Sequence, residues 1–146
     1  MKLLYQTSCF LIFCFIFQHQ MFAQTINHEE KVTEKILYFF EGLNSKDTLK
    51  IKSTLATNVG LKSMLIKGDE QQLVADEMNE FLKQISRLPE DLIIREEIKN
   101  LKINLRFPLA DVFTDYVFYI NNEQSHGGIN LFTLAYLNNT WKIINI

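Results

Sequence analysis

The sequence predicts an α+β fold in which helices pack on one face of a bent antiparallel sheet. Residues 109–146 alternate in twos, are rich in aromatic and β-branched residues, and are interrupted only at clusters of Asn, Glu and Gly. This pattern is typical of three antiparallel strands joined by two hairpins. Residues 27–88 instead carry apolar residues at steps of three and four, the spacing of amphipathic helices. Helices early in the chain and strands late are the order of an α+β domain.

Residues 1–23 have the plan of a secretory signal peptide. Lys2 precedes an apolar run, polar residues follow, and Ala23 stands before the expected cleavage site. The apolar run spans about 15 residues, short of the ~20 that a membrane-spanning helix needs, so cleavage is favoured over an uncleaved anchor. We therefore expect an exported protein, periplasmic or secreted in a Gram-negative bacterium. After cleavage it would have one domain over residues 24–146 and no contact with the membrane.

Composition sets limits on this domain. Cys9 and Cys14 both lie in the segment that is lost, so the mature chain has no disulfide and depends on its core alone. The 146 residues include 15 basic and 17 acidic ones, and the loss of Lys2 leaves 14 and 17, a net charge of −3. Because these charges are interspersed without a basic patch, nucleic acid is not an expected partner.

Two helices are predicted first. Asn27 has the features of an N-cap, with Glu30 three residues on completing a capping box. An apolar stripe then continues to about Leu43, where the first helix ends. Asp47 can cap a second, shorter helix that buries Leu49, with Leu55 as a further candidate.

A short strand and a third helix follow. Residues 58–60, Asn-Val-Gly, break the second helix, and Leu61–Lys67 is a strand candidate closed by Gly68-Asp69. Steps of three and four predict a helix over Glu70–Leu88, which Pro89 stops. From Leu92 to Phe107 the period changes to two, indicating a strand with one wet face, and Pro108 marks a bend before residue 109.

With these elements in place, the sequence resembles the nuclear transport factor 2-like superfamily, whose fold is a cone-shaped α+β roll. It is most similar to small exported bacterial members of the SnoaL-like or lumazine-binding type. The likeness covers nearly the whole mature chain and contains no exclusive catalytic signature. The residues that carry it are Phe39-Phe40-Glu41-Gly42-Leu43, Leu109-Ala110-Asp111-Val112-Phe113 with Tyr116 and Phe118, Ser125-His126-Gly127-Gly128-Ile129-Asn130-Leu131-Phe132, and Trp141-Lys142-Ile143.

The resemblance implies a cavity between the helices and the concave face of the sheet. Side-chain alternation puts Val112, Thr114, Tyr116 and Phe118 on one face of their strand, and His126, Gly128, Asn130, Phe132 and Leu134 on one face of the next. The resemblance favours Tyr116, His126, Asn130, Phe132 and Trp141 as inward. The expected ligand-binding residues are Thr114, Tyr116, Asn130, Phe132 and Trp141. No strand carboxylate is expected inside the cone.

Three functions are compatible with this pattern. The first is binding of a small, partly apolar molecule in the cone, because an inward amide such as Asn130 must find polar partners. The second is a proton-transfer enzyme, an isomerase, dehydratase or cyclase, in which His126 is general acid or base. Alternatively, His126 merely satisfies backbone groups at a hairpin, and Tyr116 and Trp141 are ordinary core residues.

The third function is protein interaction through the outer face of the sheet. An apolar surface is predicted there, and such patches usually mark interfaces, so a homodimer is expected unless a loop covers it. It comprises Phe113, Val117, Tyr119, Ile129, Leu131, Ala135 and Leu137. No cofactor is expected, since no helix follows Gly127-Gly128 to cradle a phosphate. No metal is expected either, because His28 and His126 lie on unrelated elements and His19 is removed.

Overall fold

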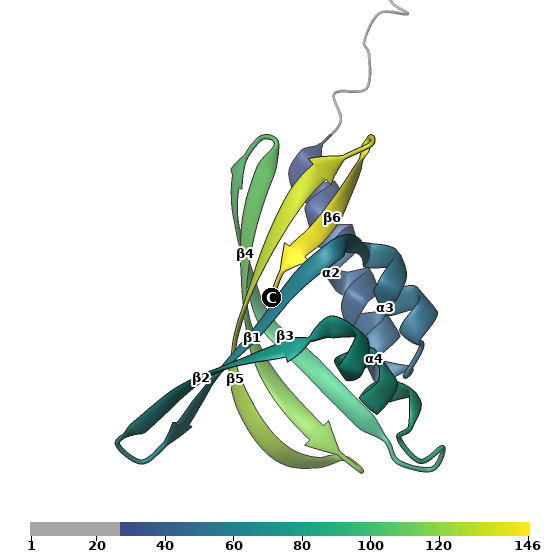
Figure 1. Cartoon of the computed structure of the whole chain (residues 1–146), viewed down its shortest axis with the longest axis vertical. Helices are drawn as coiled ribbons and strands as arrows, with labels where there is room; N and C mark the ends of the chain where they lie inside the picture. The colour runs from purple at the N-terminus through teal and green to yellow at the C-terminus, as the bar shows by residue number, and fades with distance from the viewer. Residues whose placement is uncertain (1–26) are drawn as a thin grey trace, which may run out of the picture.

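The computed structural model describes residues 27–146 (Figure 1). The predicted signal peptide, residues 1–23, lies outside the described residues. Among the described residues, none of the helices is long and apolar enough to cross a membrane.

The first two helices begin at the predicted caps. Helix α2 spans His28–Asn44, and the Asn27 side chain accepts a hydrogen bond from the Glu30 backbone N–H. Helix α3 spans Thr48–Thr54, and Asp47 accepts in the same way from the Lys50 N–H. The prediction that Leu49 is buried was wrong. Leu49 is 79% exposed, because α3 turns Ile51 toward the core instead.

Residues 55–88 depart most from prediction. Strand β1 covers Leu55–Lys67 and continues through the expected break at 58–60, where the ladder to its neighbour is only locally irregular. The predicted helix over Glu70–Leu88 is wrong in its first part. Strand β2, Glu70–Glu77, pairs antiparallel with β1 through the Gly68-Asp69 turn, and helix α4 spans only Met78–Ser86. Gly68 has a φ of 60°, a conformation that suits glycine in such a turn.

The remaining strands follow the prediction. Strands β3 (Ile94–Arg106), β4 (Leu109–Ile120), β5 (Glu123–Leu137) and β6 (Thr140–Asn145) form successive antiparallel pairs. The β4–β5 and β5–β6 hairpins turn at Asn-Asn pairs with positive φ, the geometry that matches the twist of two-residue hairpins. The sheet order is β2-β1-β6-β5-β4-β3. β1 pairs with β6 in parallel, so the sheet is mixed rather than purely antiparallel as predicted.

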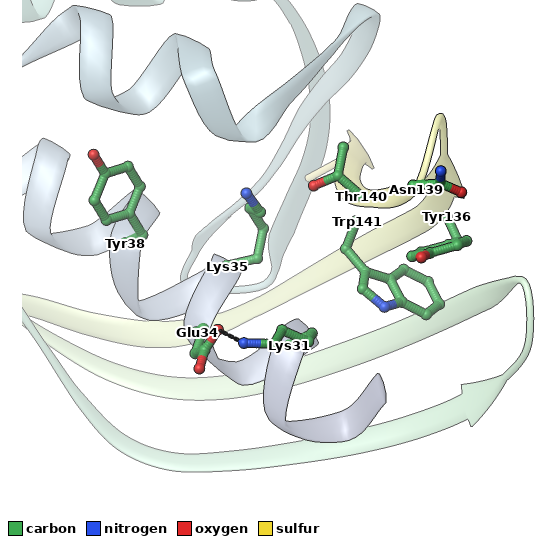
Figure 2. Close-up of a pocket in the computed structure, with 8 residues that line it drawn as sticks. All are labelled: Lys31, Glu34, Lys35, Tyr38, Tyr136, Asn139, Thr140 and Trp141. Carbon is green, nitrogen blue, oxygen red and sulfur yellow. Dashed lines mark hydrogen bonds and ion pairs between the residues drawn. The ribbon is translucent and has the colours of Figure 1, made fainter. Parts of the chain in front are cut away.

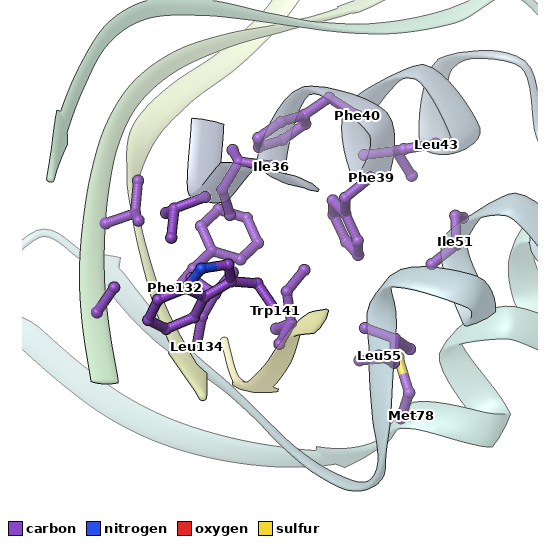
Figure 3. Close-up of a cluster of buried hydrophobic side chains, with 14 of the residues drawn as sticks. Ile36, Phe39, Phe40, Leu43, Ile51, Leu55, Met78, Phe132, Leu134 and Trp141 are labelled. Carbon is purple, nitrogen blue, oxygen red and sulfur yellow. The ribbon is translucent and has the colours of Figure 1, made fainter. Parts of the chain in front are cut away.

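The sheet curls strongly, and all three helices of the described region lie on its concave side (Figure 1). The core fills the space between them. Phe132 of β5 packs edge-to-face against Phe39 and Phe40 of α2, with ring centroids 5.4 and 5.5 Å apart. Figure 3 shows Ile36 of α2 facing this group, with Trp141 of β6 close by. The chain is therefore an α+β cone, as expected.

Strand register confirms which side chains share a face. Thr114 lies opposite Asn130, and Val112 opposite Phe132, on the concave side. On the convex side Phe113 lies opposite Leu131, and Ile129 is 70% exposed. The β1–β2 hairpin extends beyond the rest of the sheet, away from the helices (Figure 1), and carries exposed apolar residues of its own.

Candidate functional site

A cavity of about 200 Å³ lies inside the cone, between α2, α4 and the concave sheet. Its wall is almost entirely apolar. Aromatic and aliphatic side chains from the helices face strands β3 to β5, and only two lining residues are polar. The lining residues are Phe39, Phe40, Leu43, Leu61, Phe81, Ile85, Glu96, Phe118, Asn130, Phe132 and Ile146.

The two polar residues of this wall are bonded to each other. The Asn130 Nδ2 atom on β5 donates to Oε1 of Glu96 on β3, at 2.7 Å. Strand β4 separates the two residues in the sheet, so their side chains meet across it on the concave face. The predicted inward amide therefore has a carboxylate partner.

The backbone of Glu96 is held from the helix layer. Asn44, in the last turn of α2, donates through Nδ2 to the Glu96 carbonyl at 3.2 Å and accepts at Oδ1 from the Glu96 N–H at 2.7 Å. Glu96 is thus fixed at both its backbone and its side chain, by residues from two other elements. Such double anchoring is what a preorganised polar group in a ligand site requires.

Burial dominates the electrostatics of this pair. It raises the pKa of the Glu96 carboxyl, because an apolar wall solvates the charged form poorly, and the hydrogen bond from Asn130 only partly opposes this. Burial also raises the pKa of Tyr116, with the Glu96 charge as a second cause. The carboxyl and the phenol are therefore near enough to interact, and both are biased toward their protonated forms.

Tyr116 owes its position to Gly128. A Cβ atom added to Gly128 would lie 2.9 Å from the Tyr116 hydroxyl oxygen and from a ring carbon, so the phenol ring lies directly over the glycine. Gly128 is the cross-strand partner of Tyr116. Gly128 of the glycine pair, which lacked a phosphate-binding context in the sequence, therefore makes room for an aromatic side chain, while Gly127 lies against the Tyr116 backbone carbonyl.

His126 lies at the open end of the same face. It is exposed and stacks on Phe118 at a centroid distance of 5.1 Å, with Tyr116 edge-on at 5.9 Å. Its Nδ1 atom is 3.1 Å from the Ser125 hydroxyl. Within residues 27–146 no carboxylate forms a hydrogen bond to this imidazole, so the orienting acid of a typical proton-transfer pair is missing there.

The other expected ligand-binding residues divide between cavity, core and groove. Phe132 lines the cavity and is fully buried, while Thr114 is fully buried beside Asn130. The Thr114 hydroxyl has no hydrogen-bond partner among the described residues. Trp141 is buried toward the other end of α2, where its indole N–H donates to Nδ1 of His28 at 3.3 Å. It does not line the cone cavity.

The prediction that no strand carboxylate points inward was wrong, because Glu96 does. Ile94, Glu96 and Ile98 share one face by alternation, and both isoleucines pack in the core. The sequence signal for an inward-pointing carboxylate here was that apolar residues flank it at i−2 and i+2. A register shift between Ile98 and Asn100 hides it, since counting back by twos from Leu101 puts Glu96 on the wrong face.

A second concave surface lies outside the cone (Figure 2). This groove, of about 460 Å³, separates α2 from the β5–β6 hairpin and holds no part of the Glu96–Asn130 pair. In the chain from residue 27 onward, no three His, Cys, Asp or Glu side chains come together as a metal site would need. In the cavity wall the Glu96 carboxyl can hydrogen-bond and exchange a proton and the Asn130 amide can hydrogen-bond, whereas Tyr116, an expected ligand-binding residue, does not line the cavity.

Comparison with known proteins bears on the fold. No protein-family model and no curated protein matches the sequence. Solved structures do match. An NTF2-like protein of unknown function from Shewanella baltica superposes with a TM-score of 0.60 and 12% identity, over 84% of this chain and 93% of that chain.

Two further solved structures have the same fold. An NTF2-like protein of unknown function from Pseudomonas putida has a TM-score of 0.63 and 10% identity, over 81% of this chain and 82% of the other. A proposed dehydratase of the NTF2-like family from Streptomyces avermitilis has a TM-score of 0.59 and 13% identity, over 80% and 90%. The described chain therefore has the fold of the nuclear transport factor 2-like (NTF2-like) proteins.

Proposed function

We propose that this protein is an exported domain that binds a small, partly apolar molecule in the cone cavity. The observation that carries the proposal is the Glu96–Asn130 pair, a hydrogen-bonded carboxylate and amide in an otherwise apolar wall. Small-molecule sites typically combine apolar lining with a few fixed polar groups. Export is supported by the signal-peptide pattern of residues 1–23.

The cavity limits what the ligand can be. Its volume of about 200 Å³ is somewhat larger than the ~150 Å³ cavity that accommodates benzene. The ligand is therefore a single ring or a short branched chain. The Asn130 carbonyl oxygen is left to accept, and the second Glu96 oxygen accepts when ionised and donates when protonated, so the ligand should carry a hydroxyl, which can do both.

Native mass spectrometry of the protein purified from its own compartment tests this function. A bound small molecule is expected in the wild type and in Glu97→Gln, whose side chain lies among charged neighbours outside the cavity. The adduct should be lost in Asn130→Leu. An empty wild-type protein, or an adduct that survives in Asn130→Leu, would refute binding at the pair.

A second candidate function is proton transfer, and one observation favours it with a different base from the one predicted. Glu96 is half-buried with a raised pKa next to Tyr116, whereas His126 is exposed. A carboxyl tuned upward by burial suits general acid–base work near neutral pH. Assayed on small ketones and hydroxy compounds, an enzyme using this site should lose turnover in Glu96→Gln and keep it in His126→Ala. The reverse result would restore the imidazole as the base.

We also propose that the outer sheet face pairs two copies of the chain. Phe113, Ile129 and Leu131 are exposed next to one another there, and an isologous dimer buries such a face on both copies at once. Size-exclusion chromatography with light scattering should give a dimer. A monomer at micromolar concentration would rule this pairing out.

A further inference from the structure

The groove outside the cone combines aromatic and cationic side chains. It is lined by Lys31, Glu34, Lys35, Tyr38, Tyr136, Asn139, Thr140 and Trp141. We propose that this groove is a second binding site, for a small organic anion with a flat apolar body, such as an aromatic carboxylate. The site is independent of the cone cavity, with which it shares no lining residue.

The charge in this groove is unbalanced. Lys31 and Glu34 form an ion pair at 2.8 Å and cancel each other. Lys35 forms no ion pair within the described residues. Residues 1–26 contain no Asp or Glu, so that segment has no carboxylate to offer. One cation therefore remains in the wall of the groove.

A second cation strengthens this excess. The Lys142 ammonium donates to the Ser53 carbonyl at 2.6 Å, a contact with a neutral group that leaves its charge in place. The pKa of Lys35 is lowered, first by burial and then by the charge of Lys142. Two positive charges near a groove, in a chain whose net charge is −2, favour an anionic ligand that would relieve their repulsion.

The apolar body of the ligand has its own surface. Tyr136 and Trp141 contact each other with ring centroids 5.5 Å apart, and Tyr38 contributes a third ring from α2. Figure 2 shows Lys35 extending from α2 in the middle of the groove, with Tyr38 on one side and the Trp141 and Tyr136 rings together on the other. Trp141 is buried beneath the groove. A planar molecule would therefore rest on the more accessible rings of Tyr38 and Tyr136, with Lys35 between them for its acid group. The volume of about 460 Å³ lies in the usual range for small-molecule sites, about 300–1,000 Å³.

The protein carries its own reporter for this site, because Trp141 is its single tryptophan. Titration of the mature protein with 4-methylbenzoate, followed by tryptophan fluorescence, should give saturable binding that weakens with salt. The neutral 4-methylbenzamide should bind at least tenfold more weakly. Equal binding of the acid and the amide would overturn the proposal, as would no response to either.

Single substitutions test where the probe binds. Lys35→Met should reduce benzoate affinity to that of the amide, whereas Lys35→Arg, which keeps the charge, should retain most of it. Lys62→Met, an exposed lysine on the β1–β2 hairpin, is the matched control and should bind as the wild type does. Asn130→Leu should also leave this binding unchanged. If Asn130→Leu abolishes the response and Lys35→Met does not, the probe binds in the cone and the second site is refuted.

Discussion

The Asn44 side chain forms two hydrogen bonds with the backbone of Glu96, one to its carbonyl and one from its N–H. This contact joins the C-terminal end of α2 to strand β3. It fixes the backbone position from which the Glu96 carboxylate reaches the cavity wall. An amide can satisfy a peptide group in this way because it has a donor and an acceptor side by side.

Asn44→Ala should therefore destabilise the protein by about 1–3 kcal/mol, the usual effect of leaving half-buried backbone groups unsatisfied. Urea unfolding measures this change. Asn100→Ala is the matched control on the same strand, because Asn100 is exposed and bonds only the Asp115 side chain. Equal losses in the two variants would contradict an anchoring role for Asn44.

Glu96→Gln should stabilise the protein at about pH 8, and the gain should shrink toward about pH 4. The pKa of Glu96 is raised above its usual 4.5 by burial, so the native state holds the proton more tightly than the unfolded state. Stability contributed by this group is present at low pH and is lost as the pH rises through the raised pKa. Glutamine removes that loss and still accepts from Asn130.

Glu97→Gln should change stability in the direction opposite to Glu96→Gln when both are measured by urea unfolding across this pH range. Lys99 and Arg95 hold the pKa of Glu97 below its usual value, so its favourable contribution is present above that value and lost in acid. Glu97→Gln should be slightly less stable than the wild type near neutral pH and equal to it in acid. If both variants changed stability in the same direction near neutral pH, Glu96 would not be a buried carboxyl.

Local signals predicted much of this fold. Asn27 and Asp47 indicate where the two helices begin. They can be recognised in the sequence because an N-cap bonds only to the next few residues. Strands β4 to β6 were recognisable because each buries one face and is bounded by Asn-Asn turns. Alternation then put Tyr116 on one face of β4 and Asn130 on one face of β5, and the resemblance to the NTF2-like fold indicated that these faces point inward.

Features set by distant contacts escaped prediction. The segment 70–77 has the composition and spacing of a helix start, and it becomes β2 because pairing with β1 overrides that preference. The parallel pairing of β1 with β6 joins Leu55 to Ile143, which are far apart in the sequence, so no local pattern indicates it. Glu96 was missed because one extra residue near Lys99 shifts the alternation of β3.

Gly128→Ala should destabilise the protein by about 0.5–1.5 kcal/mol, because the half-buried Tyr116 side chain must leave its rotamer to make room. The new methyl would lie 2.9 Å from the Tyr116 hydroxyl oxygen, so the ring must move. In a Tyr116→Ala background the same change should cost little. A double-mutant cycle from urea unfolding measures the coupling, and simple additivity would contradict the close contact.

Thr114→Val should leave stability unchanged or raise it by about 1 kcal/mol, because a buried hydroxyl without a partner gains nothing from burial. Thr54→Val is the matched control. Thr54 is equally buried, but its hydroxyl donates to the Ile51 carbonyl at 2.6 Å, so this variant should be destabilised. Thermal unfolding distinguishes the two. A large loss in Thr114→Val would instead indicate that the hydroxyl is bonded, for example to an ordered water.

Ile129→Lys should convert a dimer to a monomer while leaving the fold intact. Ile129 lies on the convex face and is 70% exposed, so the substitution costs the monomer little but places a charge in the centre of the proposed interface. Leu49→Lys is the control, since Leu49 is equally accessible but lies on α3, on the opposite side of the sheet. Sedimentation velocity over a concentration series should show the dissociation constant rising at least tenfold for Ile129→Lys alone. If both variants weaken association equally, or neither does, the convex face is not where two copies meet.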